Sequence, residues 1–455
     1  MNWRGNKLTY NKSQIGQVSV KNTAKTEIQP KKTTNIGKKN TLSNKDNNVN
    51  NNNYLNKRVD TNYCNKIGSN NNYYYNNVLY DKNNIYSYYN HGNNNNNYLG
   101  NNNYIQTYPI EEKPNENINV NNLSLINPKC LANLGNTCYM NACLQCFFHI
   151  EDFTKRFIEE YQNFNYLKNN TFCKAYYYFI WNYCKNRSDC FKPEKFRDAL
   201  INYNKIFQLT SGNDSKDVVI AILSNLNEEL KKRFKVIDNN KDVDYTDEEE
   251  SFNDCIEEMS SCPTLIVEFF NWIHKTKSQC LKCHKIYYDF SQENIFIFNV
   301  ESIYLKYCGN SYKKEIDILD GFKYFMEQDK DEPNNKFYCY NCNKEQKAYI
   351  THFISLLPKT IIIILYKGKE GNEYNCKVNY REKLDLTNIV DNYVNEKPVY
   401  ELIAITINYS FHTIAVCKHF DGQWYLFDDR TYSKTSIEEF KDAETYLLFY
   451  KFVGR

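Results

Sequence analysis

Hydrophobic positions divide this chain into two unequal parts. From residue 1 to about 123 the sequence is dominated by asparagine, with runs at 50–53 and 93–97 and interleaved tyrosine and lysine. Aliphatic residues are few there and follow no sustained period, so the segment cannot bury enough apolar surface to offset the entropy of ordering it. We therefore predict a disordered, low-complexity, Asn-rich region over 1–123, followed by a globular domain over 124–455.

Within the predicted domain, the spacing of apolar residues changes from helical to extended along the chain. A helical period predicts helices at 140–157, 176–185, 193–202 and 214–233. Runs of β-branched and aromatic residues then predict strands at 286–299, 347–356, 361–366, 400–408, 412–418, 424–428 and 445–452. Between the two groups lies an acidic insertion, about 236–260, which we expect on the solvated surface. Helices followed by strands are typical of an α+β fold.

Composition and charge argue against several classes of partner. The formal net charge is +3 and arginine is scarce in the Asn-rich region, so we expect no nucleic-acid partner. No apolar run reaches the length of a membrane span without charges, so we expect no membrane association. The cysteine count of 17 is odd and no signal peptide is present, which favours free thiols in a reducing compartment, the cytoplasm or the nucleus. We expect a monomer.

One cysteine lies where a turn passes into a predicted helix, in the segment Asn133-Leu-Gly-Asn-Thr-Cys-Tyr-Met-Asn141. The side chain of Asn136 or Thr137 can cap the first turn, because its oxygen accepts from free backbone N–H groups. The positive end of the helix dipole then favours the thiolate of Cys138, which is its reactive form. The alternative is a buried structural cysteine, because free cysteines are often buried.

A histidine and an acidic pair far downstream complement this cysteine. His412 begins one predicted strand and Asp428 ends the next, so their side chains can lie together at one end of a sheet. A cysteine, a histidine and an orienting aspartate are the groups of a thiol-protease triad. His412 would accept the proton of Cys138, and Asp428 would hold the imidazole. Taken alone, His412 would more simply be a core or surface histidine.

Four cysteines form two pairs with C-x₂-C spacing, Cys280 with Cys283 and Cys339 with Cys342. Four thiolates in two close pairs suit one tetrahedral zinc ion in a closed structural site, which leaves no position for water. The segment between the pairs is long and polar, so we expect it to have little core of its own and to depend on the metal for folding. The alternative is four unrelated cysteines in a cysteine-rich chain.

One predicted helix opens with two acids, Asp214 and Asp217, which are three residues apart and therefore on one face of its first turns. Asp214 can cap the helix, and Asp217 can complement its dipole. Both carboxylates could also bind a basic peptide, because the pairing of arginine with carboxylate is directional and charge-assisted.

The Cys138 segment and the segment from His412 to Asp429 resemble the Cys and His boxes of the ubiquitin-specific protease family, a class of cysteine deubiquitinases. The resemblance implies a papain-like α+β fold, with a helical thumb carrying the cysteine, a β-rich palm carrying the histidine and aspartate, and zinc-tipped fingers at about 280–345. It implies hydrolysis of the peptide or isopeptide bond after the C-terminal glycine of ubiquitin through a thioester. The implied partners are ubiquitin and ubiquitinated proteins. The implied cofactor is one structural zinc ion, with no catalytic cofactor.

The resemblance also assigns roles to further residues. Asn133 matches the family position whose side-chain amide donates to the oxyanion. Asp214 and Asp217 match acids that meet arginines in the ubiquitin tail. Asp429 could assist catalysis, because some family members use the second acid of this pair.

The His box departs from the family pattern at two positions. Phe411 stands where the family usually has glycine, and Thr413 stands where it usually has tyrosine. Glycine tolerates a positive φ, so the turn before His412 must differ here. These departures leave two alternatives open: a catalytically weak or inactive ubiquitin-binding scaffold, and a protease for another ubiquitin-like modifier.

Overall fold

The computed structural model describes most of the chain from residue 117 onward. The described residues are 117–164, 167, 171–208, 213–234, 243–309, 315–327, 335–368, 376–390, 397–409, 411–441 and 443–454. The disorder predicted for 1–116 lies outside them and stays a prediction. Residues 117–123, which we assigned to the same region, instead pack on the folded domain. There the 3-10 helix η2 (Val120–Leu125) buries Leu123, and the backbone N–H of Ile118 donates to the side chain of Gln162.

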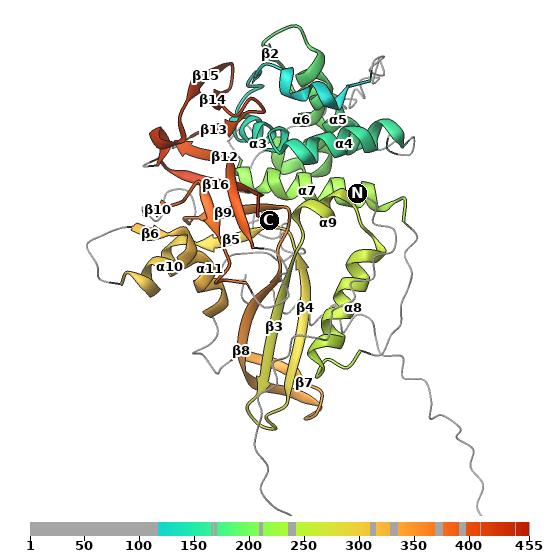
Figure 1. The fold of residues 1–455 in the computed structure, drawn as a ribbon, viewed down its shortest axis with the longest axis vertical. Coiled ribbons are helices and arrows are strands. Elements are labelled where there is room, and N and C mark those ends of the chain that lie inside the picture. The colour runs from blue at the N-terminus through green and yellow to red at the C-terminus, as the bar shows by residue number, and fades with distance from the viewer. Residues whose placement is uncertain are drawn as a thin grey trace, which may run out of the picture. The chain divides into compact units, whose positions relative to one another are not determined.

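Helices make up the first half of the domain. The helix that begins at Cys138 lies at their centre. They are α3 (Cys138–Phe148), α4 (Glu151–Asn163), α5 (Thr171–Lys185), α6 (Glu194–Tyr203), α7 (Ser215–Lys231) and α9 (Leu265–Phe270), with the 3-10 helix η4 (Lys205–Gln208). Every residue of α3 is buried, because α3 packs between neighbouring helices and the sheet (Figure 1). The helix predicted at 140–157 is in fact α3 and α4. The Thr154 hydroxyl donates to the last carbonyls of α3, and Glu151 and Asp152 favour a new helix N-terminus.

An eight-stranded sheet carries the second half of the domain. Its order is β15-β14-β13-β12-β16-β9-β5, with β11 paired to β12. The strands are β5 (Phe296–Asn299), β9 (Thr360–Tyr366), β11 (Lys383–Asp385), β12 (Val399–Tyr409), β13 (His412–Lys418), β14 (Trp424–Asp428), β15 (Thr431–Thr435) and β16 (Thr445–Phe452). All pairs are antiparallel except β5 with β9. The predicted apolar run in β9 is central and buried.

The sheet separates two hydrophobic cores. Alternate residues of β13 enter different cores, because successive side chains of a strand point to opposite faces. Ala415 and Cys417 pack with the helices around α3, whereas Ile414 and Val416 pack toward α10 (Val300–Tyr307) and α11 (Ile318–Glu327). The smaller elements are β1 (Cys130–Leu131) paired with β2 (Cys190–Phe191), β6 (Glu315–Asp317) paired with β10 (Lys377–Asn379), and η5 (Ile437–Phe440).

A second, four-stranded sheet extends away from the first (Figure 1). Its order is β4-β3-β8-β7, with β3 (Trp272–Cys280), β4 (Ile286–Glu293), β7 (Asn335–Cys339) and β8 (Lys344–Leu356). The fingers predicted at 280–345 are therefore two separate segments, 272–293 and 335–356. The expectation that the chain between the two cysteine pairs lacks a core is wrong, because β5, α10 and α11 lie there and bury residues such as Phe296, Ile303 and Phe322.

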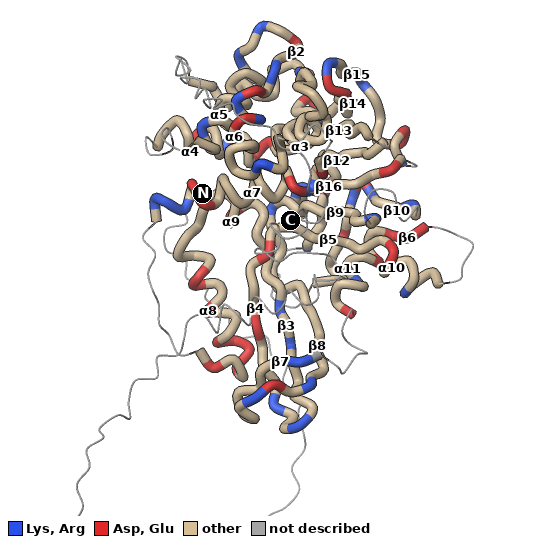
Figure 2. Tube along the Cα trace, turned by 180° about the vertical axis from the view of Figure 1, so that it is seen from behind, with Lys and Arg blue, Asp and Glu red and all other residues tan. Residues whose placement is uncertain are grey.

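The acidic insertion predicted at about 236–260 contains a helix. Residues 243–261 are described, and α8 (Glu248–Ser261) packs on β4 through Phe252 and Cys255. Asp247 caps this helix, since its side chain accepts from the Glu250 N–H. Acidic residues lie along α8, whereas basic residues gather at the tip of the four-stranded sheet (Figure 2). None of the described helices combines the length and apolar content that crossing a membrane requires. The predicted α+β class is confirmed.

Candidate active site

Cys138 is the first residue of α3 and is 6% exposed. The side chain of Asn133 closes the turn before it, because its Oδ1 accepts from the backbone N–H groups of Gly135 at 2.9 Å and Thr137 at 3.1 Å. Gly135 and Asn136 have φ values of +97° and +51°, which glycine and asparagine adopt most readily. We predicted that Asn136 or Thr137 would cap the helix. The hydroxyl of Thr137 instead accepts from the backbone upstream of the helix.

The thiol of Cys138 has a pKa above its ordinary value. Burial is the main cause and the carboxylate of Asp429 adds to it, whereas the backbone N–H of Thr413, which donates to the sulfur, lowers the pKa. The sequence predicts that the helix N-terminus favours the thiolate, and backbone N–H groups do lower the pKa here, but burial outweighs them. This thiol needs a base before it can act as a nucleophile.

His412 and Asp428 lie on neighbouring strands and share a hydrogen bond. The register pairs Ala415 with Phe427, which places Asp428 opposite Ile414 and puts His412 on the same face, two residues along. His412 Nε2 is 2.7 Å from Asp428 Oδ1. Their side chains are 37% and 49% exposed, so a substrate can reach the imidazole.

Asp429 contacts two amides rather than the imidazole. Its Oδ2 accepts from Asn133 Nδ2 and its Oδ1 accepts from Asn141 Nδ2, each at 2.8 Å. The backbone of Asp429 is left-handed, with a φ of +46°. The ligand-capable atoms of His412, Asp428 and Asp429 all lie within 4.8 Å of one another. Asp429 therefore links the His–Asp pair to the turn that carries Cys138.

Cys138 and His412 belong to one site but are not yet paired. Among the described residues, no hydrogen bond joins Cys138 Sγ to the His412 ring, and the sulfur accepts from the neighbouring Thr413 N–H. A cavity of about 10 Å³ lies beside the thiol and is lined by Thr413 and Asp429, among others. Hydrogen bonds between catalytic groups are often long in free enzymes and tighten when substrate binds.

The strands on either side of the position before His412 are antiparallel neighbours. Tyr409, the last residue of β12, pairs with His412, the first residue of β13. Phe411, which stands where glycine was expected, is 87% exposed. A large apolar side chain thus projects into solvent one residue before His412.

The two acids of the third motif lie at the N-terminus of α7, where a lysine offsets part of their charge. Asp214 caps the helix: its Oδ1 accepts from the Lys216 N–H at 2.9 Å, and its Oδ2 accepts from Lys216 Nζ at 2.7 Å and from Tyr446 Oη at 2.8 Å. Asp217 Oδ1 is 3.6 Å from the same Nζ. Burial raises the pKa of Asp217, and Lys216 opposes that rise.

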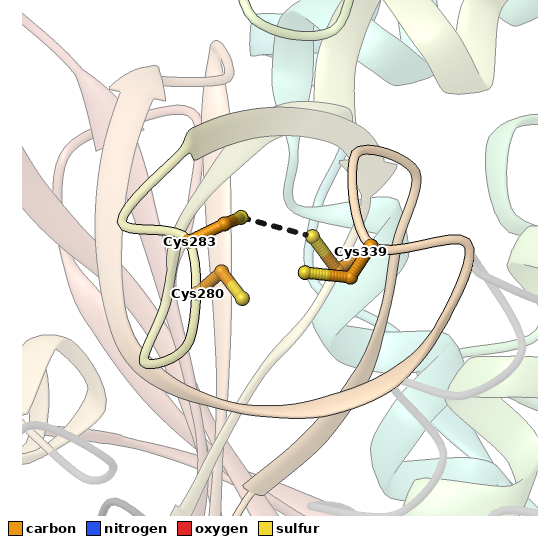
Figure 3. A group of neighbouring side chains, drawn as sticks. Cys280, Cys283 and Cys339 are labelled. Carbon is orange, nitrogen blue, oxygen red and sulfur yellow. Dashed lines mark hydrogen bonds between the residues drawn. The ribbon is translucent and has the colours of Figure 1, made fainter.

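The four cysteines predicted as metal ligands lie together at the tip of the four-stranded sheet, and Figure 3 labels three of them, Cys280, Cys283 and Cys339. The sulfurs of Cys280, Cys283, Cys339 and Cys342 all lie within 4.8 Å of one another, and Cys283 Sγ is 3.5 Å from Cys339 Sγ. Sulfurs around a tetrahedral zinc ion are about 3.8 Å apart, so the cluster fits one ion. The pKa values within the cluster diverge: the backbone N–H of Lys285 is the main cause that lowers the pKa of Cys283 to about 6, whereas burial raises the pKa of Cys342 to about 12.

Comparison with known sequences identifies the family. The sequence profile described as ubiquitin carboxyl-terminal hydrolase matches residues 130–450, more than half of the chain. The chain belongs to this family.

Relatives within the ubiquitin carboxyl-terminal hydrolase family are moderately similar. The chain is 26% identical over 282 residues to ubiquitin carboxyl-terminal hydrolase 13 of Saccharomyces cerevisiae, a match that covers 57% of this chain and 34% of that protein. The chain thus spans about a third of the length of that relative. It is 24% identical over 353 residues to ubiquitin carboxyl-terminal hydrolase 12 of Salmo salar, covering 70% of this chain and 88% of that protein.

Solved structures of this family share the fold. A SAGA DUB module of Ubp8, Sgf11, Sus1 and Sgf73 bound to monoubiquitin matches with a TM-score of 0.55 and 18% identity, covering 73% of this chain and 70% of that chain. The same module bound to ubiquitin aldehyde matches with a TM-score of 0.53 and 20% identity, covering 71% and 69%. The papain-like fold predicted from the sequence is confirmed.

Sequence reasoning missed two residues that contact the predicted ones in this family member. Asn141 is 3% exposed and reaches Asp429. Its signal was its place in the motif, since a polar residue one turn after Cys138 on a largely apolar helix must find partners inside the protein. Lys216 lies between the two acids in the sequence. Its signal was a cation in the first turn of a helix, where the dipole disfavours positive charge.

Proposed function

We propose that this protein is a thiol-dependent deubiquitinase that hydrolyses the peptide or isopeptide bond after the C-terminal glycine of ubiquitin. The observation that carries the proposal is the hydrogen bond from His412 to Asp428, together with the link from Asp429 through Asn133 to the turn of Cys138. The family supports a hydrolase of this class, and a structural neighbour is bound to ubiquitin.

The proposed reaction begins with proton transfer from the Cys138 thiol to His412. Because Nε2 is bonded to Asp428, Nδ1 is the nitrogen that accepts the proton. The sulfur then attacks the carbonyl carbon of the terminal glycine, forming a C–S bond and an oxyanion. When the C–N bond breaks, the imidazolium gives its proton to the leaving amine. Water, activated by the neutral imidazole, hydrolyses the thioester and releases the ubiquitin carboxylate and the thiol.

Asn133 stabilises the oxyanion in this mechanism, and Asp429 positions Asn133. One hydrogen of the Asn133 amide is bonded to Asp429, and its Oδ1 is fixed by two backbone N–H groups, so the second amide hydrogen has a defined direction. The backbone N–H of Cys138 is a natural second donor. Loss of one oxyanion donor typically costs on the order of 3 kcal/mol of barrier.

Substrate binding has a specific task in this mechanism. The thiol of Cys138 is neutral at rest, because burial raises its pKa, and it is not bonded to His412 among the described residues. We propose that the tail of ubiquitin draws the imidazole onto the thiol when it enters the site. The Cys138 thiol would then react only slowly until a substrate is bound.

We also propose that the four-cysteine cluster binds one structural zinc ion. Four sulfur ligands leave no open position for water, so the ion would supply folding free energy at the fingertip and no chemistry. The Tyr287 hydroxyl, which lies 3.6 Å from Cys339 Sγ and accepts from the Asn341 N–H, would hold the second cysteine pair in place.

Ubiquitin carrying a C-terminal electrophile tests the proposed activity. The purified full chain is incubated with this probe and, in parallel, with other ubiquitin-like modifiers so equipped, and the labelled residue is mapped by mass spectrometry. We expect ubiquitin to label Cys138. Labelling only by another modifier would change the substrate. Binding of ubiquitin without labelling would favour an inactive scaffold, an alternative that the unpaired thiol and the exposed Phe411 support.

A further inference from the structure

The first turn of α7 carries a lysine whose ammonium group lies between two carboxylates. Lys216 Nζ is 2.7 Å from Asp214 Oδ2 and 3.6 Å from Asp217 Oδ1. The side chains of Lys216, Asp214 and Asp217 are 21%, 32% and 34% exposed, so this contact is partly shielded from solvent. The three charges sum to −1, whereas the acids alone would give −2.

The acids hold this lysine in place, and the helix does not. The helix N-terminus is the positive end of the dipole, so a cation in the first turn is disfavoured unless anions neutralise it. Asp214 is itself fixed, since it also accepts from the Lys216 backbone N–H and the Tyr446 hydroxyl. The flexible four-carbon side chain of Lys216 is therefore the part of this cluster that can move.

The cluster is anchored beside the nucleophile. Asn213 Nδ2 donates to Tyr139 Oη at 3.1 Å, and Tyr139 directly follows Cys138. Cys143 Sγ, on the same helix as Cys138, lies 3.3 Å from the Ser215 carbonyl oxygen. The acid-bearing turn of α7 is therefore held against the helix that carries Cys138.

We propose that Lys216 is a built-in competitor of the substrate's basic tail and sets how strongly the enzyme depends on the charge of that tail. This inference rests on the proposed function and on the role that the family resemblance assigns to Asp214 and Asp217, which is to bind arginines of the ubiquitin tail. An arginine can displace the ammonium, because its planar guanidinium pairs with carboxylates through two parallel hydrogen bonds. Displacement costs the contacts of Lys216, so the wild-type protein gains less from tail arginines than the acids alone would provide. A substrate tail without charge leaves Lys216 in place, so Lys216 costs it little binding free energy.

Steady-state kinetics on full-length Lys216→Met tests this inference. The substrates are ubiquitin with a C-terminal fluorogenic amide, and the same substrate with its tail arginines replaced by glutamine. We expect Lys216→Met to lower KM about three- to ten-fold for the arginine tail, with kcat unchanged, and to leave KM for the glutamine tail unchanged. The KM for the arginine tail should also rise more steeply with salt in the variant than in the wild type.

Lys231→Met is the matched control, because it removes the same charge from the other end of α7. Lys231 is paired with Glu228 at 3.2 Å, and its side chain is 43% exposed. This variant should leave both KM values unchanged. Lys216→Gln, which keeps a polar group, should reproduce the effect of Lys216→Met if the latter folds poorly. An arginine-tail KM that stays the same or rises in both Lys216 variants would overturn the inference.

Failure of the proposed function gives a different result. If the wild type turns over neither substrate, the same ubiquitin proteins are titrated into each full-length variant and their affinity is measured by calorimetry. Tighter binding of the arginine-tailed ubiquitin to the Lys216 variants than to the wild type, with no such gain in Lys231→Met, would uphold the inference without the hydrolase activity. Absence of ubiquitin binding by every variant would overturn both.

Discussion

Asp428 and Asp429 are adjacent in the sequence but contact different parts of the site. Asp428 is bonded to His412, whereas Asp429 is bonded to Asn133 and Asn141. Asp429 also has a left-handed backbone, with a φ of +46°. The sequence could predict an acid beside His412 from strand pairing. It could not predict which carboxylate serves the imidazole, because that depends on how α3 packs against the turn between β14 and β15.

The first prediction concerns the nucleophile. Cys138→Ala should reduce hydrolysis of a fluorogenic ubiquitin substrate below detection and leave the dissociation constant for ubiquitin within a few-fold of the wild type. The reason is that Cys138 is 6% exposed and offers little contact area. Calorimetry with ubiquitin measures the binding. Hydrolysis near the wild-type rate in this variant would exclude the proposed mechanism.

The second prediction separates the two acids. Asp429→Asn should slow hydrolysis by roughly a hundred-fold, because Asn133 loses its anchor. It should also make Cys138 react faster with iodoacetamide at neutral pH, because the Asp429 carboxylate raises the pKa of the thiol and its removal lowers that pKa. Peptide mapping measures the alkylation of Cys138 separately from that of the other cysteines.

Asp428→Asn is the comparison for that experiment. It should slow hydrolysis by roughly a hundred- to ten-thousand-fold, through a poorly oriented His412, and leave alkylation of Cys138 close to the wild-type rate. Equal alkylation rates in Asp429→Asn and the wild type would show that Asp429 has no electrostatic influence on the thiol.

At the scale of elements, strongly periodic segments were predicted and polar ones were not. β9, β12, β13, β14 and β16 match their predicted ranges within a residue or two. β3 was missed, because it contains Lys275 and Lys277 and lacks the alternation of a half-buried strand. The structure explains why a lysine stands in this strand. Lys275 is only 4% exposed, and its Nζ is 3.0 Å from Glu248 of α8. The helix that satisfies this lysine lies within the stretch predicted to be an acidic surface insertion.

The third prediction concerns the metal at the fingertip. Purified wild type should contain about one zinc ion per chain, and Cys283→Ser should lower that content toward zero, because three sulfurs form an incomplete site. Hydrogen exchange should become faster at the ends of β3, β7 and β8. It should not change in α10 or α11, because these helices have their own apolar core.

Cys262→Ser controls for the loss of a cysteine elsewhere, since Cys262 is half-buried and lies outside the cluster. Elemental analysis and exchange mass spectrometry supply the measurements. Zinc-free wild type that still binds ubiquitin and resists exchange at the fingertip would contradict the site.

At the scale of the whole molecule, buried histidine pairs tie distant elements together. His149 Nε2 is 3.0 Å from His419 Nδ1, which joins the end of α3 to the turn after β13. His274 Nε2 is 2.9 Å from His352 Nδ1, across β3 and β8. The order of helices and strands predicted the α+β class. These pairs escaped prediction, because the partners are far apart in the sequence and no local pattern links them.

The last prediction is that the folded domain loses stability as the pH falls below about 6.5, the pKa of an unperturbed histidine. Burial lowers the pKa of His149 to about 3 and also lowers the pKa values of His419 and His274. Below pH ~6.5 the unfolded chain therefore binds protons that the folded chain cannot. Each such histidine lowers the free energy of unfolding by about 1.4 kcal/mol per pH unit until its folded-state pKa is reached.

Urea unfolding of the wild type and His149→Gln at pH 7.5, 6.5 and 5.5 measures this loss. The variant should be less stable at pH 7.5, because it leaves His419 without its partner. Between pH 6.5 and 5.5 the wild type should lose about 1 kcal/mol more than the variant, since the variant lacks one titrating group. Carboxylates with raised pKa values, such as Asp217, act in the opposite direction but are common to both proteins, so they cancel in the difference. Parallel losses in the two proteins would mean that His149 is protonated in the folded state, with its positive charge shared with His419.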